Sequence, residues 1–218
     1  RRIRAQLVVF VGEAVQRHQG GSRAEARARA LQLLDQVKVP SPAARLNNYP
    51  HEMSGGMRQR AMIALALSCS PRLVLADEPT TALDATVQIQ VLLIIRELQQ
   101  RLGMSAIFVT HDLGVAAEVC DRIAVMYAGR IVETGRTEDV LLHPQHPYTQ
   151  ALLASTIHGS LRGTRIEGIR GAPPDLTRLP QGCAFRDRCS RARSECGGDV
   201  PVLHPVQGGH AVACHAIP

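Results

Sequence analysis

Hydrophobic residues recur with helical spacing in three stretches of the chain. After Ser22, apolar residues lie three or four positions apart as far as Pro40, which predicts an amphipathic helix capped by Ser22. The same spacing follows Ser54 and fills the stretch between Asp84 and Gly103. Ser54 and Asp84 are therefore predicted N-caps, and Gly103 a C-terminal stop. The predicted inward positions of the third helix are Val87, Val91, Leu92, Ile95 and Leu98.

Short uninterrupted apolar runs separate these helices. The run from Leu73 to Ala76 predicts a buried parallel strand, and runs at 105–110 and 122–127 predict two more. Residues 128–130 form a predicted turn into a strand at 131–133, which makes a hairpin. The alternation of strands and helices predicts an α/β fold, with a largely parallel sheet covered by helices on both faces.

Composition limits the class of protein. A chain of 218 residues, 45% of them hydrophobic, suits one sizeable globular domain with an appendage. No apolar run approaches the ~20 residues of a membrane span, and no secretory signal peptide is recognisable. The net charge is +6, but the arginines are scattered and aromatic residues make up only 3%. A basic surface near a membrane is therefore favoured over nucleic-acid binding.

The stretch from Met53 to Asp84 carries the candidate chemistry. Ser54 and the Gly55-Gly56 pair begin a predicted helix, where backbone N–H groups and the helix dipole favour an anion such as phosphate. Asp77 and Glu78 follow a predicted strand. Because successive side chains diverge at a strand end, one carboxylate can face a metal ion while the other faces a water molecule.

Four motifs, in this order, resemble those of ATP-binding-cassette (ABC) ATPases. Ser54-Gly55-Gly56 with Arg58-Gln59-Arg60 resembles the signature motif, and Leu73 to Glu78 resembles the Walker B strand with its catalytic glutamate. Thr81-Ala82-Leu83-Asp84 resembles the D-loop, and Thr110-His111-Asp112 the switch histidine. The resemblance implies an ABC-type cassette with a helical subdomain, which binds and hydrolyses ATP with Mg²⁺.

The resemblance also implies a role for each polar residue. Glu78 and His111 are the implied catalytic residues, because a carboxylate can polarise the attacking water and a histidine can sense the γ-phosphate. Asp77 would hold the magnesium ion. The other implied nucleotide-binding residues contact ATP held by the opposite cassette or couple the two sites: Ser54, Gly55, Gly56, Gln59 and Asp84.

A P-loop is missing from this sequence. The form Gly-x-x-x-x-Gly-Lys-[Ser/Thr] requires a Gly-Lys pair, whereas Lys38 is the only lysine. The chain opens at Arg1 and has no convincing glutamine loop, so we expect a fragment that alone binds ATP weakly and hydrolyses it poorly. The predicted parts are the signature-motif and Walker B half of a cassette (1–155), a linker (156–180) and a cysteine-containing extension (181–218).

The extension contains four cysteines with the spacing Cys-x₅-Cys-x₆-Cys-x₁₇-Cys: Cys183, Cys189, Cys196 and Cys214. Disulfides are the least favoured use in a cytoplasmic ATPase, and zinc usually takes more closely spaced pairs. Four cysteines can ligate a [4Fe–4S] cluster. A mixed Cys/His zinc site stays open because histidines lie nearby: His204, His210 and His215.

The carboxyl-terminal part resembles the extension of oligopeptide/dipeptide importer ATPases. The resemblance is carried by His146-Pro147-Tyr148-Thr149, by the turn at 171–174, and by the surroundings of the cysteines, including Phe185 and Arg188. Met57, where many cassettes have Gln, also matches this subfamily. The resemblance covers residues 12–218 and implies, for some members, a [4Fe–4S] cluster, with the four cysteines as ligands.

The implied function is the ATP-hydrolysing subunit of a peptide importer on the cytoplasmic face of the membrane. The implied partners are a second cassette, two transmembrane permeases and an extracytoplasmic peptide-binding protein, and no nucleic acid is expected. Three alternatives remain: a nickel importer ATPase, a soluble cassette ATPase of nucleic-acid metabolism, and a non-catalytic regulatory cassette. A soluble ATPase should show long insertions and no cysteine tail, and a non-catalytic cassette is disfavoured by the intact Glu78 and His111.

Overall fold

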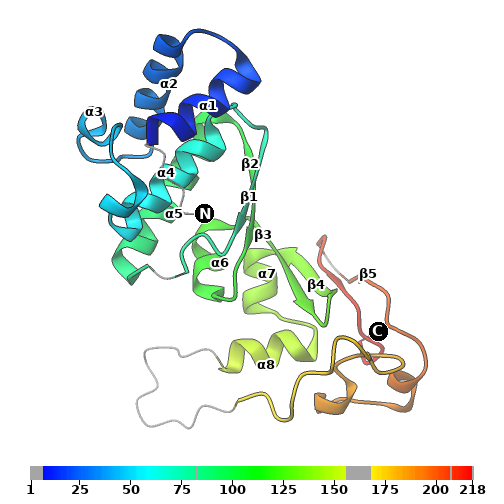
Figure 1. Ribbon diagram of the computed structural model, residues 1–218. Coiled ribbons are helices and arrows are strands. Elements are labelled where there is room, and N and C mark those ends of the chain that lie inside the picture. The colour runs from blue at the N-terminus through cyan, green and yellow to red at the C-terminus, as the bar shows by residue number, and fades with distance from the viewer. Residues whose placement is uncertain (1–6, 82, 156–167, 207, 218) are drawn as a thin grey trace. The chain divides into compact units, whose positions relative to one another are not determined.

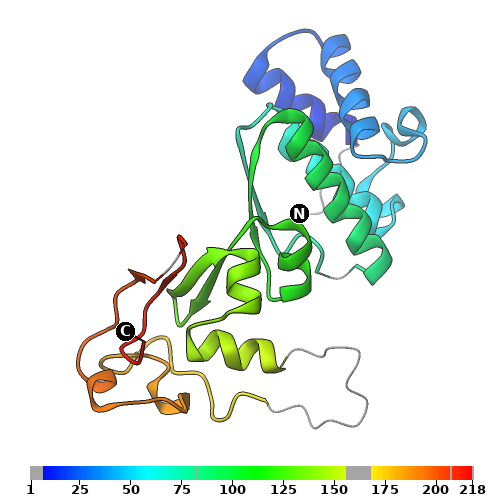
Figure 2. The same ribbon diagram turned by 180° about the vertical axis from the view of Figure 1, so that it is seen from behind.

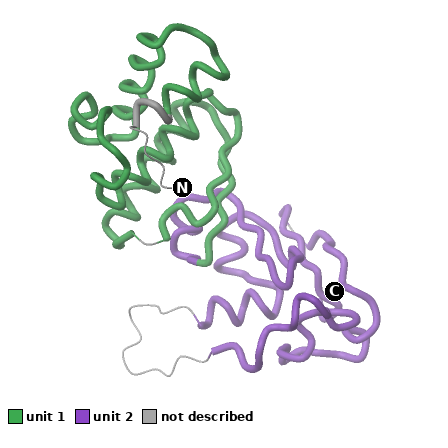
Figure 3. Tube along the Cα trace, viewed as in Figure 1, with its two compact units in different colours: residues 1–111 green, residues 112–218 purple. Residues whose placement is uncertain are grey.

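The residues described by the computed structural model are 7–81, 83–155, 168–206 and 208–217 (Figure 1). Parts of two predicted segments lie outside the described residues, namely Ala82 of the D-loop and residues 156–167 of the linker. The chain divides into two compact units, unit 1 with residues 1–111 and unit 2 with residues 112–218 (Figure 3).

Unit 1 combines packed helices with a parallel pair of strands. Its described elements are α1 (Leu7–Gln19), α2 (Arg23–Gln36), α3 (Pro42–Arg45), the 3₁₀ helix η1 (Pro50–Glu52), α4 (Gly55–Leu67), β1 (Leu73–Asp77), α5 (Ala85–Leu102) and β2 (Ser105–Val109). Figure 2 turns the molecule around and brings the long helix α5 of this unit to the front. Of the helices described in both units, none is long and apolar enough to cross a membrane.

The three predicted helices of unit 1 are confirmed. Helix α2 begins with a capping box in which the Ser22 side chain accepts from the Glu25 N–H and the Glu25 carboxylate accepts from the Ser22 N–H. Helix α5 ends at Gly103, whose φ of 63° is the left-handed conformation that glycine adopts readily. Its predicted inward residues are buried except Val87, which is half-buried, and Ile94 is buried as well. Together α1, α2, α4 and α5 enclose an apolar core that includes Val11, Ala30, Leu34, Ala64 and Leu98.

The predicted strand at 73–76 is present as β1, but its predicted burial is wrong for one face. Strands β1 and β2 pair in parallel with Leu75 opposite Ile107, and among the described residues they form a two-stranded sheet. Leu75 is 71% exposed and Ile107 52% exposed, and Leu73 and Val109 are exposed on the same face. The reason is tertiary: an apolar strand is buried only where another element covers it, and no described residue of unit 1 covers this face.

Unit 2 is built on an antiparallel sheet. Its described elements are α6 (Leu113–Val119), β3 (Arg122–Tyr127), β4 (Arg130–Arg136), α7 (Thr137–Leu142), α8 (Pro147–Ser155), the 3₁₀ helices η2 (Arg186–Arg188) and η3 (Ser194–Gly197), β5 (His204–Pro205) and β6 (Ala211–Val212). The β3–β4 hairpin is confirmed. The prediction of a largely parallel sheet is wrong for the described residues, because the strands of unit 2 run antiparallel in the order β3-β4-β6-β5.

The carboxyl-terminal tail joins this sheet and packs on it. Strand β6 pairs with β4, so that Val212 lies opposite Glu133. Phe185 is 2% exposed and packs against Tyr127 of β3 and Tyr148 of α8, with ring centroids 5.2 and 5.4 Å apart. The Arg188 guanidinium donates to the Tyr127 hydroxyl over 3.2 Å. Phe185, the one aromatic residue of the predicted extension, therefore belongs to the packing of unit 2.

A buried carboxylate connects β4 to the tail. Glu133 is fully buried, and its carboxylate accepts the backbone N–H groups of Gln145 (2.7 Å) and His146 (3.0 Å). The Nε2 of His210, in the tail, lies 2.7 Å from the same carboxylate. Burial lowers the pKa of His146 to about 4, so its ring is neutral at pH 7 and its Nδ1 accepts the Tyr148 N–H over 3.0 Å.

Candidate functional site

The backbone turns abruptly where β1 ends. Glu78 donates its N–H to the Val109 carbonyl over 2.9 Å, which extends the pairing of β1 with β2 by one residue. Its φ is 43°, a left-handed conformation that is uncommon for a residue with a β-carbon and that often occurs at functional sites. The chain then turns back, and Thr81 donates its N–H to the Glu78 carbonyl over 3.2 Å. This turn leaves the Glu78 side chain at the carboxyl end of both strands.

The Glu78 carboxylate contacts two side chains, one at each oxygen. His111 Nδ1 lies 3.1 Å from Oε1, although the two residues are 33 positions apart. The Thr81 hydroxyl donates to Oε2 over 2.7 Å. The hydrogen bonds from Thr81 and His111 lower the pKa of Glu78, so the carboxylate is ionised at pH 7. The side chains of His111 and Glu78 are 77% and 44% exposed, which leaves both accessible to a ligand.

The second cluster lies at the starts of α4 and α5. Both predicted N-caps are confirmed: the Ser54 hydroxyl accepts the Met57 N–H over 3.4 Å, and the Asp84 carboxylate accepts the Val87 N–H over 2.9 Å. A β-carbon on Gly56 would lie 2.5 Å from Val87 Cγ1, too close for any real contact. The signature glycine therefore lets the first turns of α4 and α5 approach each other, a packing role that the sequence pattern did not reveal.

The remaining predicted nucleotide-binding residues are accessible. Asp77 is the last residue of β1 and is exposed, and Gln59 is half-buried on α4. A β-carbon on Gly55 would lie 3.4 Å from Leu83 Cδ2. The structure thus brings Glu78, Thr81 and His111 together, and separately groups the signature residues with the end of the predicted D-loop. The ligand-binding and catalytic roles of these residues stay predictions.

The four cysteines of the tail lie in one part of unit 2. The other three thiols act electrostatically on Cys183, Cys196 also acts on Cys189 and Cys214, and the Cys183 N–H donates to the Cys196 carbonyl over 2.8 Å. Burial, followed by the neighbouring thiols, raises the pKa of the Cys183 and Cys214 side chains. The donor type therefore suits a four-cysteine cluster. The four cysteine side chains are not arranged as a ligand set, because in the described residues no three His, Cys, Asp or Glu side chains are positioned to hold a metal ion.

The nearby histidines have other partners. His210 contacts the buried Glu133 carboxylate, and His215 Nε2 lies 2.9 Å from the Asp199 carbonyl oxygen. His204 Nδ1 lies 3.3 Å from the Val202 carbonyl oxygen. These contacts give the mixed Cys/His zinc site no support.

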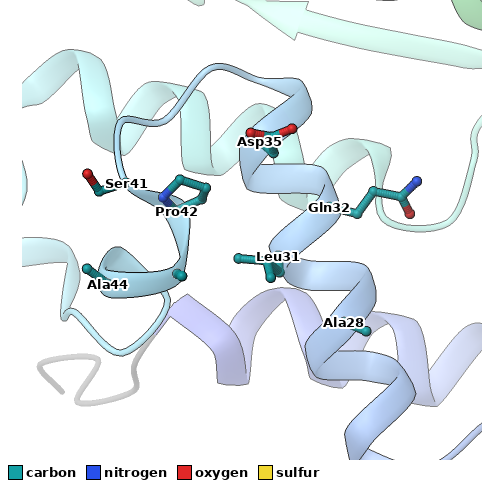
Figure 4. Close-up of a pocket in the computed structure, with 8 residues that line it drawn as sticks. Ala28, Leu31, Gln32, Asp35, Ser41, Pro42 and Ala44 are labelled. Atoms are coloured by element: carbon teal, nitrogen blue, oxygen red, sulfur yellow. The ribbon is translucent and has the colours of Figure 1, made fainter.

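An open groove of about 600 Å³ lies between α2 and α3 in unit 1 (Figure 4). Leu31 points into it from α2, and Ser41 and Pro42 form its other side (Figure 4). Ser41 has a φ of 52°. None of the predicted site residues lines this groove, so it is separate from both clusters.

Two family models match separate parts of the chain. Residues 2–81 match the ABC transporter family, and residues 132–196 match the family described as oligopeptide/dipeptide transporter, C-terminal region. The first match begins at residue 2, so the prediction that the resemblance starts at residue 12 is wrong.

Curated relatives carry related names. A probable peptide ABC transporter ATP-binding protein of Sinorhizobium fredii is 53% identical over 206 residues, which cover 94% of this chain and 61% of that protein. A dipeptide transport ATP-binding protein of Bacillus subtilis is 47% identical over 204 residues, which cover 94% of this chain and 61% of that protein. The chain thus spans about three fifths of the length of these relatives.

Solved structures show the same fold. An ATP-binding cassette solved as a dimer with ADP and phosphate is 29% identical, with a TM-score of 0.54 over 62% of this chain and 57% of that one. Fold and family matches together define an ABC-type ATPase cassette. Within that class, the chain belongs to the ABC transporter ATPases that carry the oligopeptide/dipeptide transporter C-terminal region.

Proposed function

We propose that this chain supplies the signature-motif and catalytic-glutamate half of an ATPase that energises peptide import across the cytoplasmic membrane. The observation that carries this proposal is the contact of Glu78 with His111, at the adjacent carboxyl ends of two parallel strands. A carboxylate that can accept a proton from water and an imidazole that can donate to a phosphate lie together there, as hydrolysis of Mg-ATP requires. Because Nδ1 of His111 faces Glu78, Nε2 is the nitrogen that would reach the γ-phosphate.

The other predicted residues complete this scheme. Asp77, beside Glu78 at the end of β1, would hold the magnesium ion of Mg-ATP. Ser54, Gly55, Gly56 and Gln59 would contact ATP held by a second cassette, and the dimeric cassette among the structural relatives supports that arrangement. The phosphate-cradling half would come from outside these 218 residues and would also cover the exposed apolar face of β1 and β2.

The partners follow from the peptide-transport relatives. We place the subunit on the cytoplasmic face, beneath two permeases that receive peptides from an extracytoplasmic binding protein. The match of residues 132–196 to the oligopeptide/dipeptide transporter region favours peptides over nickel as cargo. The proposed division of the chain is a cassette part at 1–155, a linker at 156–180 and an extension at 181–218.

The test is uptake of a labelled dipeptide by the complete transporter in proteoliposomes. Uptake should require Mg-ATP and the binding protein, whereas labelled Ni²⁺ should not accumulate. Accumulation of Ni²⁺ without peptide would overturn the substrate class, and uptake without ATP would overturn the energising role. The 218-residue chain assayed alone should hydrolyse ATP poorly, since it has no Gly-Lys pair to form a P-loop.

For the tail, the proposal includes a [4Fe–4S] cluster held by Cys183, Cys189, Cys196 and Cys214. Its support is the donor type of the four cysteines and the electrostatic effect of the other three thiols on Cys183, although the described side chains are not arranged as a ligand set. Bound there, such a cluster would cross-link the loops of the tail. Protein purified without oxygen should contain about four irons and four sulfides per chain. Cys189→Ser should lower both contents, whereas Cys69→Ser, at the exposed cysteine of unit 1, should leave them unchanged. One zinc per chain and no sulfide would contradict the cluster.

A further inference from the structure

Both oxygens of the Glu78 carboxylate have a side-chain hydrogen-bonding partner. Thr81 Oγ1 donates to Oε2 over 2.7 Å, and His111 Nδ1 lies 3.1 Å from Oε1. A carboxylate with one partner on each oxygen cannot rotate freely about its last torsion. Each oxygen also keeps a second lone pair, which a water molecule can occupy. The two contacts therefore fix the plane of the carboxylate and leave it able to act as a base.

Thr81 is well suited to hold one orientation. Its methyl group makes the side chain stiff at χ1, so the hydroxyl stays where the turn places it. The turn itself is closed by the hydrogen bond from the Thr81 N–H to the Glu78 carbonyl, 3.2 Å long. The residue thus binds both the backbone and the side chain of Glu78.

The same residue begins the segment that leads to α5. Of the two polar side chains in Thr81-Ala82-Leu83-Asp84, the Asp84 carboxylate accepts the Val87 N–H at the start of α5. The Thr81 hydroxyl reaches in the other direction, to Glu78. Within this chain Thr81 therefore contacts the Glu78 carboxylate, and Asp84 contacts the start of α5.

We propose that Thr81 is a positioning residue for hydrolysis, whose hydroxyl aims the Glu78 carboxylate. This inference rests on the proposed role of Glu78 as the base. Thr81 does not touch the reacting atoms and acts only through Glu78.

The test measures steady-state ATP hydrolysis by the complete transporter with variants in this subunit. Thr81→Val keeps the shape and removes the hydroxyl, so kcat should fall about tenfold while KM for ATP stays within about twofold. Thr81→Ser should recover most of the lost kcat. Thr86→Val, the same exchange at an exposed position on α5, should leave kcat unchanged.

A double-variant cycle separates this inference from the proposed function. In a Glu78→Gln background, Thr81→Val should have no further effect, because the group that it positions is already lost. If Glu78→Gln abolishes turnover but Thr81→Val matches the wild type, the Thr81 inference is overturned and the proposed function stands. If Glu78→Gln retains turnover, the base assignment fails and the inference fails with it. Equal losses in Thr81→Val and Thr81→Ser, with lowered melting temperatures, would assign Thr81 a structural role only.

Discussion

Replacing Glu78 with Gln is expected to lower ATP turnover by the complete transporter at least about a hundredfold. Glutamine has nearly the same size and its amide oxygen can still accept the Thr81 hydroxyl, but it cannot take a proton from the attacking water. Glu78 is exposed, directly follows β1 and is not part of a core cluster, so the substitution should leave folding intact. ATP should then remain bound rather than be hydrolysed.

The measurement is a single-turnover assay with radiolabelled ATP, followed by rapid separation of bound nucleotide. The variant should retain unhydrolysed ATP, and the wild type should release ADP. Glu13→Gln, which removes an exposed carboxylate on α1, is the matched control and should hydrolyse ATP at the wild-type rate. Undiminished turnover in Glu78→Gln would remove Glu78 from the catalytic role.

Replacing Glu133 with Ala is expected to lower the free energy of unfolding by about 3–5 kcal/mol. The carboxylate is fully buried and accepts the N–H groups of Gln145 and His146 while it contacts His210. Truncation leaves these buried polar groups without their acceptor, and each such loss costs about 1–3 kcal/mol. Because His210 belongs to the tail, the carboxyl-terminal strands should detach from β4 first.

Urea denaturation of the 218-residue chain measures this effect. Glu138→Ala, at an exposed position on α7 of the same unit, should change the free energy of unfolding by less than about 0.5 kcal/mol. Hydrogen exchange should show faster exchange at Val212 and Ala213 in Glu133→Ala, since both pair with β4. If Glu133→Ala and Glu138→Ala have equal free energies of unfolding, the Glu133 carboxylate does not stabilise the fold.

Local chemistry made several features predictable. Ser54 and Asp84 are caps because a short polar side chain ahead of an apolar periodic stretch satisfies the free N–H groups of a helix start. Gly103 ends α5 because glycine adopts a left-handed conformation without steric cost. The order of the motifs from Ser54 to His111 was sufficient to indicate the family, which the comparisons confirm.

Burial was predicted less well. The apolar run at 73–76 correctly indicates a strand, yet Leu75 is exposed because burial depends on what covers a strand and not on its own residues. Glu133 shows the converse, since nothing in an alternating strand sequence distinguishes a buried glutamate from an exposed one. Its three hydrogen-bonding partners come from two segments that follow it in the chain.

By itself the sequence determined the starts of α2, α4 and α5 and the end of α5, the hairpin, the family and the identity of the candidate catalytic residues, because these depend on neighbouring residues or on motif order. Only the tertiary structure decided that Thr81 and His111 hold opposite oxygens of Glu78, that Gly56 fits against Val87, and that the tail joins the sheet beside β4. These contacts join residues as far as 77 positions apart, as His210 and Glu133 are. Such contacts form only when the whole path of the chain is fixed, and a local pattern contains no information about that path.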